Sequence, residues 1–232
     1  MAWPLLEGRI DSVPFVFAAL ALAGGDDVVV DRLNFPDSGL DPPAEAWAPA
    51  VPDDRIKVIV TLEGSNDILG FDELARITVP ALGMGRDWGS LVAAGMSPDW
   101  QARQHAAIQG HPSYRVDLLN AHHVTFSDRC VTHPILRDLG LMDPGYVEWY
   151  EQALCDPFIP FSVADPLVKR YMLAFLKTEL VGESGYQSML TPGWANAREP
   201  DIQFFETEKK NPNAIDEDWP DISIYFQHQP GY

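Results

Sequence analysis

Apolar and β-branched stretches alternate with helix-compatible stretches through the middle of the chain. Residues 55–63 (RIKVIVTLE), 78–84 (TVPALGM) and 114–119 (YRVDLL) have the composition of buried strands. Residues 71–76 predict one or two helical turns, and the polar segment 100–108 predicts a helix before the third strand. Strands and helices alternating at this spacing indicate parallel βαβ units. The pattern therefore predicts an α/β fold, a mainly parallel sheet with flanking helices.

The clearest amphipathic pattern occupies residues 163–180. Asp165 and Pro166 have the residue types expected at its N-cap and first position, and Gly182 that of its C-cap. Its apolar positions recur at helical spacing: Val168, Tyr171, Met172, Phe175, Leu176 and Leu180.

Two segments lack such periodicity. Residues 31–54 are rich in Pro, Asp and Ala and predict a long loop. Residues 201–232 are acidic and carry several prolines, which predicts an irregular surface strap or a frayed end. We therefore divide the chain into a domain over residues 1–200 and an acidic C-terminal tail over 201–232.

Composition narrows the possible partners. The 232 residues are 46% hydrophobic and 22% charged, which is typical of a soluble globular protein, and their net charge is −18. Such a charge repels phosphate backbones, so we expect no nucleic-acid partner. No apolar run has the length of a membrane span; the longest, 13–23, contains Pro14.

Localisation is predicted from the same region. Glu7 and Asp11 precede the apolar run where a signal peptide would carry basic residues, which favours a cytoplasmic protein over a secreted one. Cys130 and Cys155 could pair in an oxidising compartment or remain buried thiols. We expect buried thiols, since a domain of this size needs no disulfide for its stability.

Candidate chemistry lies at two strand ends. Asp87 follows the second strand, and the turn 120–128 (NAHHVTFSD), with His123, follows the third. An Asp and then a His at successive strand ends is how an α/β-hydrolase presents the last two members of its Ser-Asp-His triad. The His takes a proton from the nucleophile, and the Asp orients the His.

Residues 55–60 (RIKVIV), 74–87 (LARITVPALGMGRD) and 121–128 (AHHVTFSD) together resemble the C-terminal half of α/β-hydrolases. The similarity is to dienelactone hydrolase and platelet-activating-factor acetylhydrolase-like esterases, and it extends to a final helix at 171–180. The resemblance covers residues 55 to 192. It implies a carboxylic-ester hydrolase without a cofactor, with His123 as base and Asp87 as acid, acting on a small ester.

The N-terminal part departs from this family. The earlier strands and the G-x-S-x-G nucleophile turn are missing, so the predicted fold is a truncated α/β-hydrolase. Ser12, in 9–17 (RIDSVPFVF), is the weak candidate for the nucleophile, and only Arg86 separates Gly85 from Asp87, one residue fewer than usual. The alternative is a non-catalytic, degenerate homologue that binds a partner or an apolar ligand.

Two further expectations concern metals and assembly. Five histidines invite a metal-dependent reading, but no H-x-H, H-x₃-H or zinc-type Cys pair occurs, so we predict no metal site: His105, His111, His122, His123 and His133. A truncated parallel sheet leaves an edge near residues 13–17, and an exposed edge pairs readily with another chain. We therefore expect a homodimer or a complementing chain at that edge.

Overall fold

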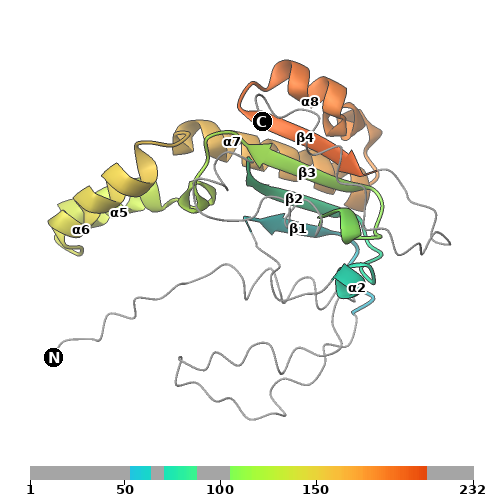
Figure 1. Cartoon of the computed structure of the whole chain (residues 1–232), viewed down its shortest axis with the longest axis horizontal. Coiled ribbons are helices and arrows are strands. Elements are labelled where there is room, and N and C mark those ends of the chain that lie inside the picture. The colour runs from blue at the N-terminus through green and yellow to red at the C-terminus, as the bar shows by residue number, and fades with distance from the viewer. Residues whose placement is uncertain (1–52, 64–70, 88–104, 208–232) are drawn as a thin grey trace, which may run out of the picture.

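The computed structural model describes residues 53–63, 71–87 and 105–207. Its centre is a four-stranded open sheet in the order β1-β2-β3-β4 (Figure 1). β1 (Ile59–Leu62), β2 (Ala81–Arg86) and β3 (Ser113–Leu118) are parallel, and β4 (Ile202–Thr207) runs antiparallel to β3. The predicted α/β class and mainly parallel sheet are confirmed. The short helix α2 (Phe71–Leu74) connects β1 to β2, as the sequence indicates.

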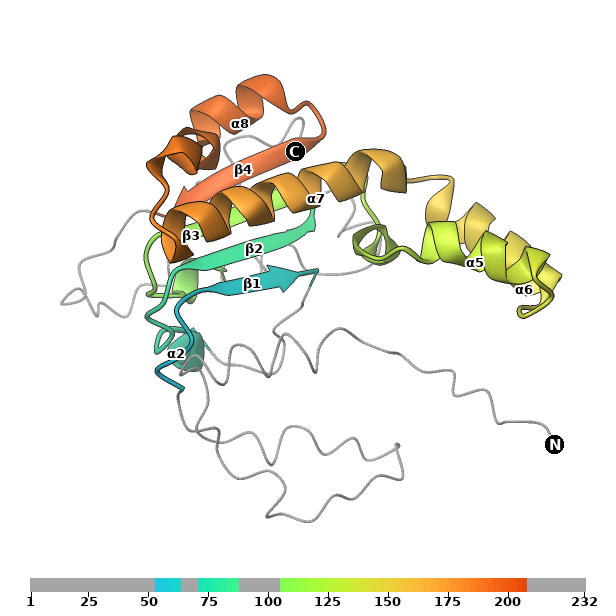
Figure 2. The ribbon, with the colours of Figure 1, turned by 180° about the vertical axis from the view of Figure 1, so that it is seen from behind.

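Apart from α2, the labelled helices follow the third strand in sequence. They are a 3₁₀ turn η4 (His123–Phe126), α5 (Arg129–Asp138), α6 (Pro144–Tyr150), a π-helical turn η5 (Glu151–Cys155), α7 (Phe161–Phe175), a π-helical turn η6 (Leu176–Leu180), a 3₁₀ helix η7 (Ser184–Leu190) and α8 (Pro192–Arg198). α7 lies along one face of the sheet, and α5 and α6 form a hairpin that extends away from it (Figures 1 and 2). Among the described residues, no helix is long and apolar enough to cross a bilayer.

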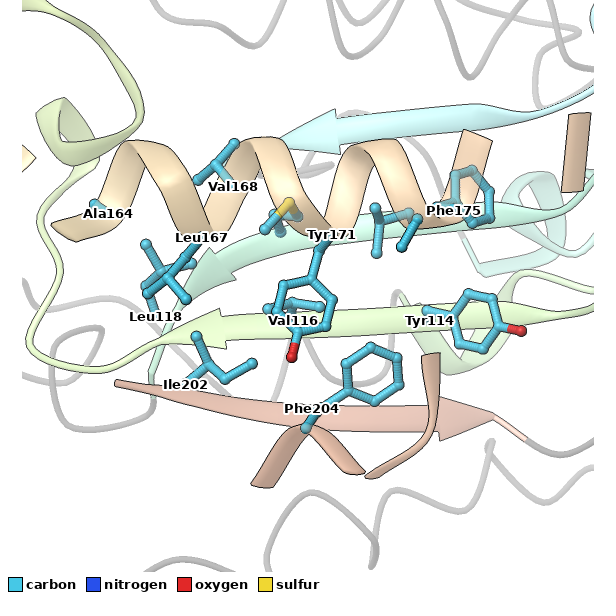
Figure 3. Packing of buried hydrophobic residues seen from close by; sticks show 14 of the residues in the cluster. Tyr114, Val116, Leu118, Ala164, Leu167, Val168, Tyr171, Phe175, Ile202 and Phe204 are labelled. Atoms are coloured by element: carbon cyan, nitrogen blue, oxygen red, sulfur yellow. The ribbon is translucent and has the colours of Figure 1, made fainter. Parts of the chain in front are cut away.

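The main core lies between the sheet and α7. Tyr171 of α7 is fully buried and contacts Phe204 of β4 at a ring-centroid distance of 5.6 Å (Figure 3). Tyr114 of β3 packs edge-on against Phe175 of α7 at 6.0 Å. Each buried aromatic side chain contributes about 1.5–3 kcal/mol of transfer free energy, so this layer fixes α7 on the sheet.

The start of α7 differs from the prediction. The helix begins at Phe161 after an extended Pro160, and Pro166 lies inside the helix instead of at its first position. Ala164 is fully buried one turn before Leu167, so burial of the apolar stripe extends the helix backwards. At the other end, Gly182 has a φ of +80°, and its N–H bonds to the Thr178 carbonyl, which confirms it as the residue that ends this helical segment.

β4 was not expected. The acidic, proline-containing composition of residues 201–232 predicts an irregular tail, whereas residues 202–207 pair with β3 along its whole length. Ile202 and Phe204 are buried against the α7 layer, and their alternation with Gln203 is a short strand pattern. Burial on a sheet that had an open edge outweighs the acidic, proline-containing context that suggested a strap.

The expectation of buried thiols is wrong, because Cys130 and Cys155 form a disulfide with a Cα–Cα distance of 5.8 Å. Cys130 lies in the first turn of α5, and Cys155 ends η5. Domain size does not predict the state of these cysteines, because the helical hairpin extends beyond the main core and has few buried residues of its own. A cross-link at its base supplies a constraint that apolar burial does not provide there.

The predicted loop up to residue 52 and the predicted tail from residue 208 lie outside the described residues, and so do three further predicted features. They are Ser12, the sheet edge near 13–17, and the part of the predicted helix 100–108 that precedes residue 105; residues 105–107 are helical.

Candidate active site

Polar side chains gather where the three parallel strands end. Glu63 follows β1, Asp87 follows β2, and the turn from Asn120 to His123 follows β3. β2 and β3 are parallel in the register Arg86↔Leu118, so their carboxyl ends lie at one edge of the sheet, as expected for Asp87 and His123. In open α/β sheets this edge is the usual position of an active site.

The backbone at this edge adopts an uncommon conformation at two positions. Glu63 has a φ of +49° and Asn120 a φ of +52°, and among the described residues no other non-glycine has a positive φ. A left-handed conformation is sparsely populated by side chains other than Asn and Asp, and it clusters at functional sites. The strained Glu63 therefore marks the end of β1 as a candidate functional position.

Asp87 holds the turn that carries the histidines. Its Oδ1 accepts a hydrogen bond from the Asn120 backbone N–H at 2.9 Å. The Asn120 side-chain amide donates to the Pro157 carbonyl at 3.1 Å. These bonds join the end of β2 to the turn after β3 and to the segment before α7.

His122 has a structural role in the same turn. Its backbone N–H donates to Thr125 Oγ1 at 2.9 Å, and its Nδ1 accepts from the Val124 N–H at 3.5 Å, which together form a capping box on η4. The ring also packs on Phe158 at a centroid distance of 4.8 Å. Partial burial and the nearby charge of Arg86 lower the pKa of His122. A neutral capping residue agrees with the packing role that the sequence suggests.

His123 faces a buried carboxylate. Its side chain is 40% exposed, and its Nδ1 lies 3.8 Å from Oε1 of Glu63, whose side chain is 3% exposed. The same Glu63 oxygen accepts a hydrogen bond from Nε of the buried Arg86 at 2.5 Å. Burial alone would raise the pKa of Glu63, but the facing His123 and the charge of Arg86 outweigh it and hold this pKa below its ordinary value. The Glu63 carboxylate is therefore ionised at neutral pH.

A second buried ion pair, formed by two residues of β3, lies beside Glu63. Arg115 Nε donates to Asp117 Oδ1 at 2.6 Å, and both side chains are buried. Gly85 pairs with Asp117 in the sheet, and a Cβ at Gly85 would lie 3.7 Å from both Asp117 Oδ1 and Glu63 Oε2. The Gly85 Cα therefore lies close to both carboxylates, at the point where they approach each other. Burial raises the pKa of Asp117 to about 6, with the charges of Asp87 and Glu63 adding to it and Arg115 opposing it.

The structure brings a different acid to His123 from the one the sequence suggested. Asp87 bonds to the Asn120 backbone, whereas Glu63 is the carboxylate within 4 Å of a His123 ring nitrogen among the described residues. Glu63 is the last residue of the first predicted strand, but the sequence predicted no role for it. Its position at a carboxyl strand end was the available signal, and its approach to His123 depends on strand register.

The side chains at this edge can act as acids, bases and hydrogen-bonding groups. In the part of the chain that the structure describes, no group of three or more His, Cys, Asp or Glu side chains is arranged to hold a metal ion. An ionised, buried carboxylate beside a half-exposed imidazole can orient that ring and stabilise its protonated form.

Comparisons with known proteins supply no assignment. No protein-family model, curated protein or solved structure matches the chain.

Proposed function

We propose that the chain is a carboxylic-ester hydrolase in which His123 acts as general base and Glu63 is its carboxylate partner. The observation that carries this proposal is the 3.8 Å approach of Glu63 Oε1 to His123 Nδ1 at the carboxyl edge of the sheet. The resemblance of residues 55–192 to the C-terminal half of α/β-hydrolases supports it. Asp87, the acid implied by that resemblance, would act by fixing the Asn120 turn.

In this proposal His123 takes the proton of a hydroxyl nucleophile through Nε2, while Nδ1–H points to Glu63. The developing imidazolium is stabilised by the Glu63 carboxylate, which Arg86 keeps ionised. The distance of 3.8 Å exceeds the usual hydrogen-bond range of about 2.6–3.2 Å, and catalytic hydrogen bonds often shorten to it only in the substrate complex. Ser12, the candidate nucleophile, lies outside the described residues.

A non-catalytic role is the second candidate, and the helical hairpin favours it. Large apolar side chains are exposed on α5, α6 and the connection between them: Val131, Ile135, Leu139, Leu141, Tyr146 and Trp149. Exposed apolar patches of this kind mark interaction surfaces. A binding protein would use this surface and would retain the edge cluster for stability alone.

Labelling with a fluorophosphonate probe, followed by peptide mapping, separates the two. An esterase gives one labelled serine, and His123→Ala abolishes the labelling because the base is lost. His122→Asn is the matched control, since Asn is a preferred capping residue, and it should label like the wild type. Absence of any labelled serine in folded wild-type protein would reject the esterase and leave the binding role.

We also infer that the protein resides in an oxidising compartment, in place of the cytoplasmic location that the sequence favoured. The Cys130–Cys155 disulfide supports this, because cytosolic proteins rarely keep such bonds. Alkylation of free thiols during isolation from the natural source tests it. Two alkylated cysteines per chain would contradict the inference.

A further inference from the structure

A pocket of about 360 Å³ lies at the base of the helical hairpin. Cys130 and Val131 of α5 form one wall, and Cys155 of η5 forms another. The stretch 158–162, which leads into α7, closes the pocket, and Thr125 of η4 lies at its side. Its volume falls at the small end of the range of about 300–1,000 Å³ that is typical of ligand sites.

We propose that this pocket binds a small neutral molecule with an apolar body and one hydroxyl group, an alcohol or a phenol. The apolar body is matched by Val131, Phe158 and Phe161, together with the disulfide sulfurs. The hydroxyl is matched by Asp156, an exposed residue that also lines the pocket and whose carboxylate can accept a donated hydrogen bond. The same carboxylate and the net charge of −18 repel an anion of equal shape.

The disulfide lines the pocket and also holds its two walls together. It joins α5 to η5 across 25 positions of sequence, and both cysteines line the pocket. An ion pair of Arg137 with Glu151 also links these elements, but it lies in the last turn of α5 and therefore away from Cys130. Reduction therefore frees the two walls at the pocket and weakens binding.

The pocket adjoins the histidine turn through three contacts. Phe158, which lines the pocket, packs on the His122 ring, and Thr125 accepts the His122 N–H. The Ile159 N–H donates to the Asn120 carbonyl at 2.8 Å. The binding proposal stands without catalysis. If the proposed esterase function also holds, the pocket is placed to take the alcohol group of the ester.

Two exposed valines provide a matched pair of variants. Val131 lines the pocket and is 45% exposed, whereas Val163, in the first turn of α7, is 38% exposed and does not line it. Val131→Trp overfills the pocket, and Val163→Trp adds the same bulk outside. Both valine side chains are exposed, so both variants should keep the fold, and neither residue belongs to the proposed catalytic group.

The experiment titrates 2-naphthol into the full oxidised chain by calorimetry, with 2-naphthoate as the anionic probe of the same body. We expect saturable one-site binding of 2-naphthol that Val131→Trp and reduction each weaken by about tenfold or more, and that Val163→Trp leaves unchanged. 2-Naphthoate should bind at least about tenfold more weakly.

Equal binding by Val131→Trp and wild type, or no saturable binding, would overturn the site. Equal affinity for both probes would overturn the ligand class, and unchanged binding after reduction would overturn the role of the disulfide. His123→Ala should bind 2-naphthol like the wild type whatever its activity, so failure of the esterase proposal and failure of the pocket are distinguished.

Discussion

Glu63 and Arg86 form a fully enclosed ion pair, with Oε1 of the carboxylate 2.5 Å from Nε of the guanidinium. Glu63 directly follows β1 and Arg86 ends β2, so the pair joins two neighbouring strands at the edge where His123 lies 3.8 Å from the same carboxylate oxygen. The pair therefore connects the stability of the sheet edge to the orientation of the histidine. Two charges with low exposure cannot be separated without leaving one of them buried and uncompensated.

Glu63→Gln should lower the free energy of unfolding by about 3 kcal/mol, because the buried Arg86 guanidinium loses the negative charge of this carboxylate. Urea denaturation measures this change. Asp53→Asn is the control, since Asp53 pairs with an Arg55 side chain that is 86% exposed, and loss of this surface pair should lower the free energy of unfolding much less than Glu63→Gln does. Equal effects of the two variants would show that the buried pair contributes no more than a surface pair.

Asp117 should make stability depend on pH in the direction opposite to that of an ordinary paired carboxylate. Burial raises its pKa from 3.8 to about 6, so between these values the folded protein binds a proton that the unfolded chain does not. Its stabilising contribution is therefore present below pH 3.8 and is lost as the pH rises through about 6. The difference between these two pKa values corresponds to roughly 3 kcal/mol in the free energy of unfolding.

Asp117→Asn removes this titration while keeping the side-chain shape. The free energy of unfolding of the wild type, minus that of the variant, should fall between pH 4 and 6 and be level outside this range. Urea denaturation at a series of pH values measures it. Parallel curves for the two proteins would contradict a raised pKa at this position.

Removal of the disulfide by Cys130→Ala and Cys155→Ala should cost about 3–4 kcal/mol, given the loop of 25 positions that it closes. Chemical denaturation of the oxidised wild type and the double variant gives the difference. A reducing agent should bring the wild type to the stability of the double variant and leave that variant unchanged. A reductant-independent difference would instead indicate altered packing at the substituted side chains.

Gly110→Ala should be severely destabilising. The Gly110 N–H donates to the Ile77 carbonyl at 2.7 Å, and a Cβ at this position would lie 1.7 Å from the Val79 carbonyl oxygen. Backbone must move to admit it, which places the cost in the rare class above about 4 kcal/mol. A Cβ at Gly185 would have no atom within 4 Å, so Gly185→Ala should change the free energy of unfolding by less than about 1 kcal/mol in thermal or urea denaturation.

Much of the scaffold follows from local pattern. The strands near residues 59, 81 and 113 and the amphipathic helix up to Gly182 could be predicted, because side-chain periodicity and a glycine C-cap act within a few residues. The placement of Asp87 and the His123 turn at one edge also follows, since successive parallel strands end on the same side of a sheet.

The candidate site itself required the tertiary structure. The sequence determined the α/β class, the positions of the central strands along the chain and the strand ends that carry acids and histidines. Only the fold decided that Glu63 faces His123, that residues 202–207 add a strand beside β3, and that Cys130 bonds to Cys155. Each of these contacts joins residues distant in sequence, and their distances are fixed by strand register, helix packing and burial, which no local pattern specifies.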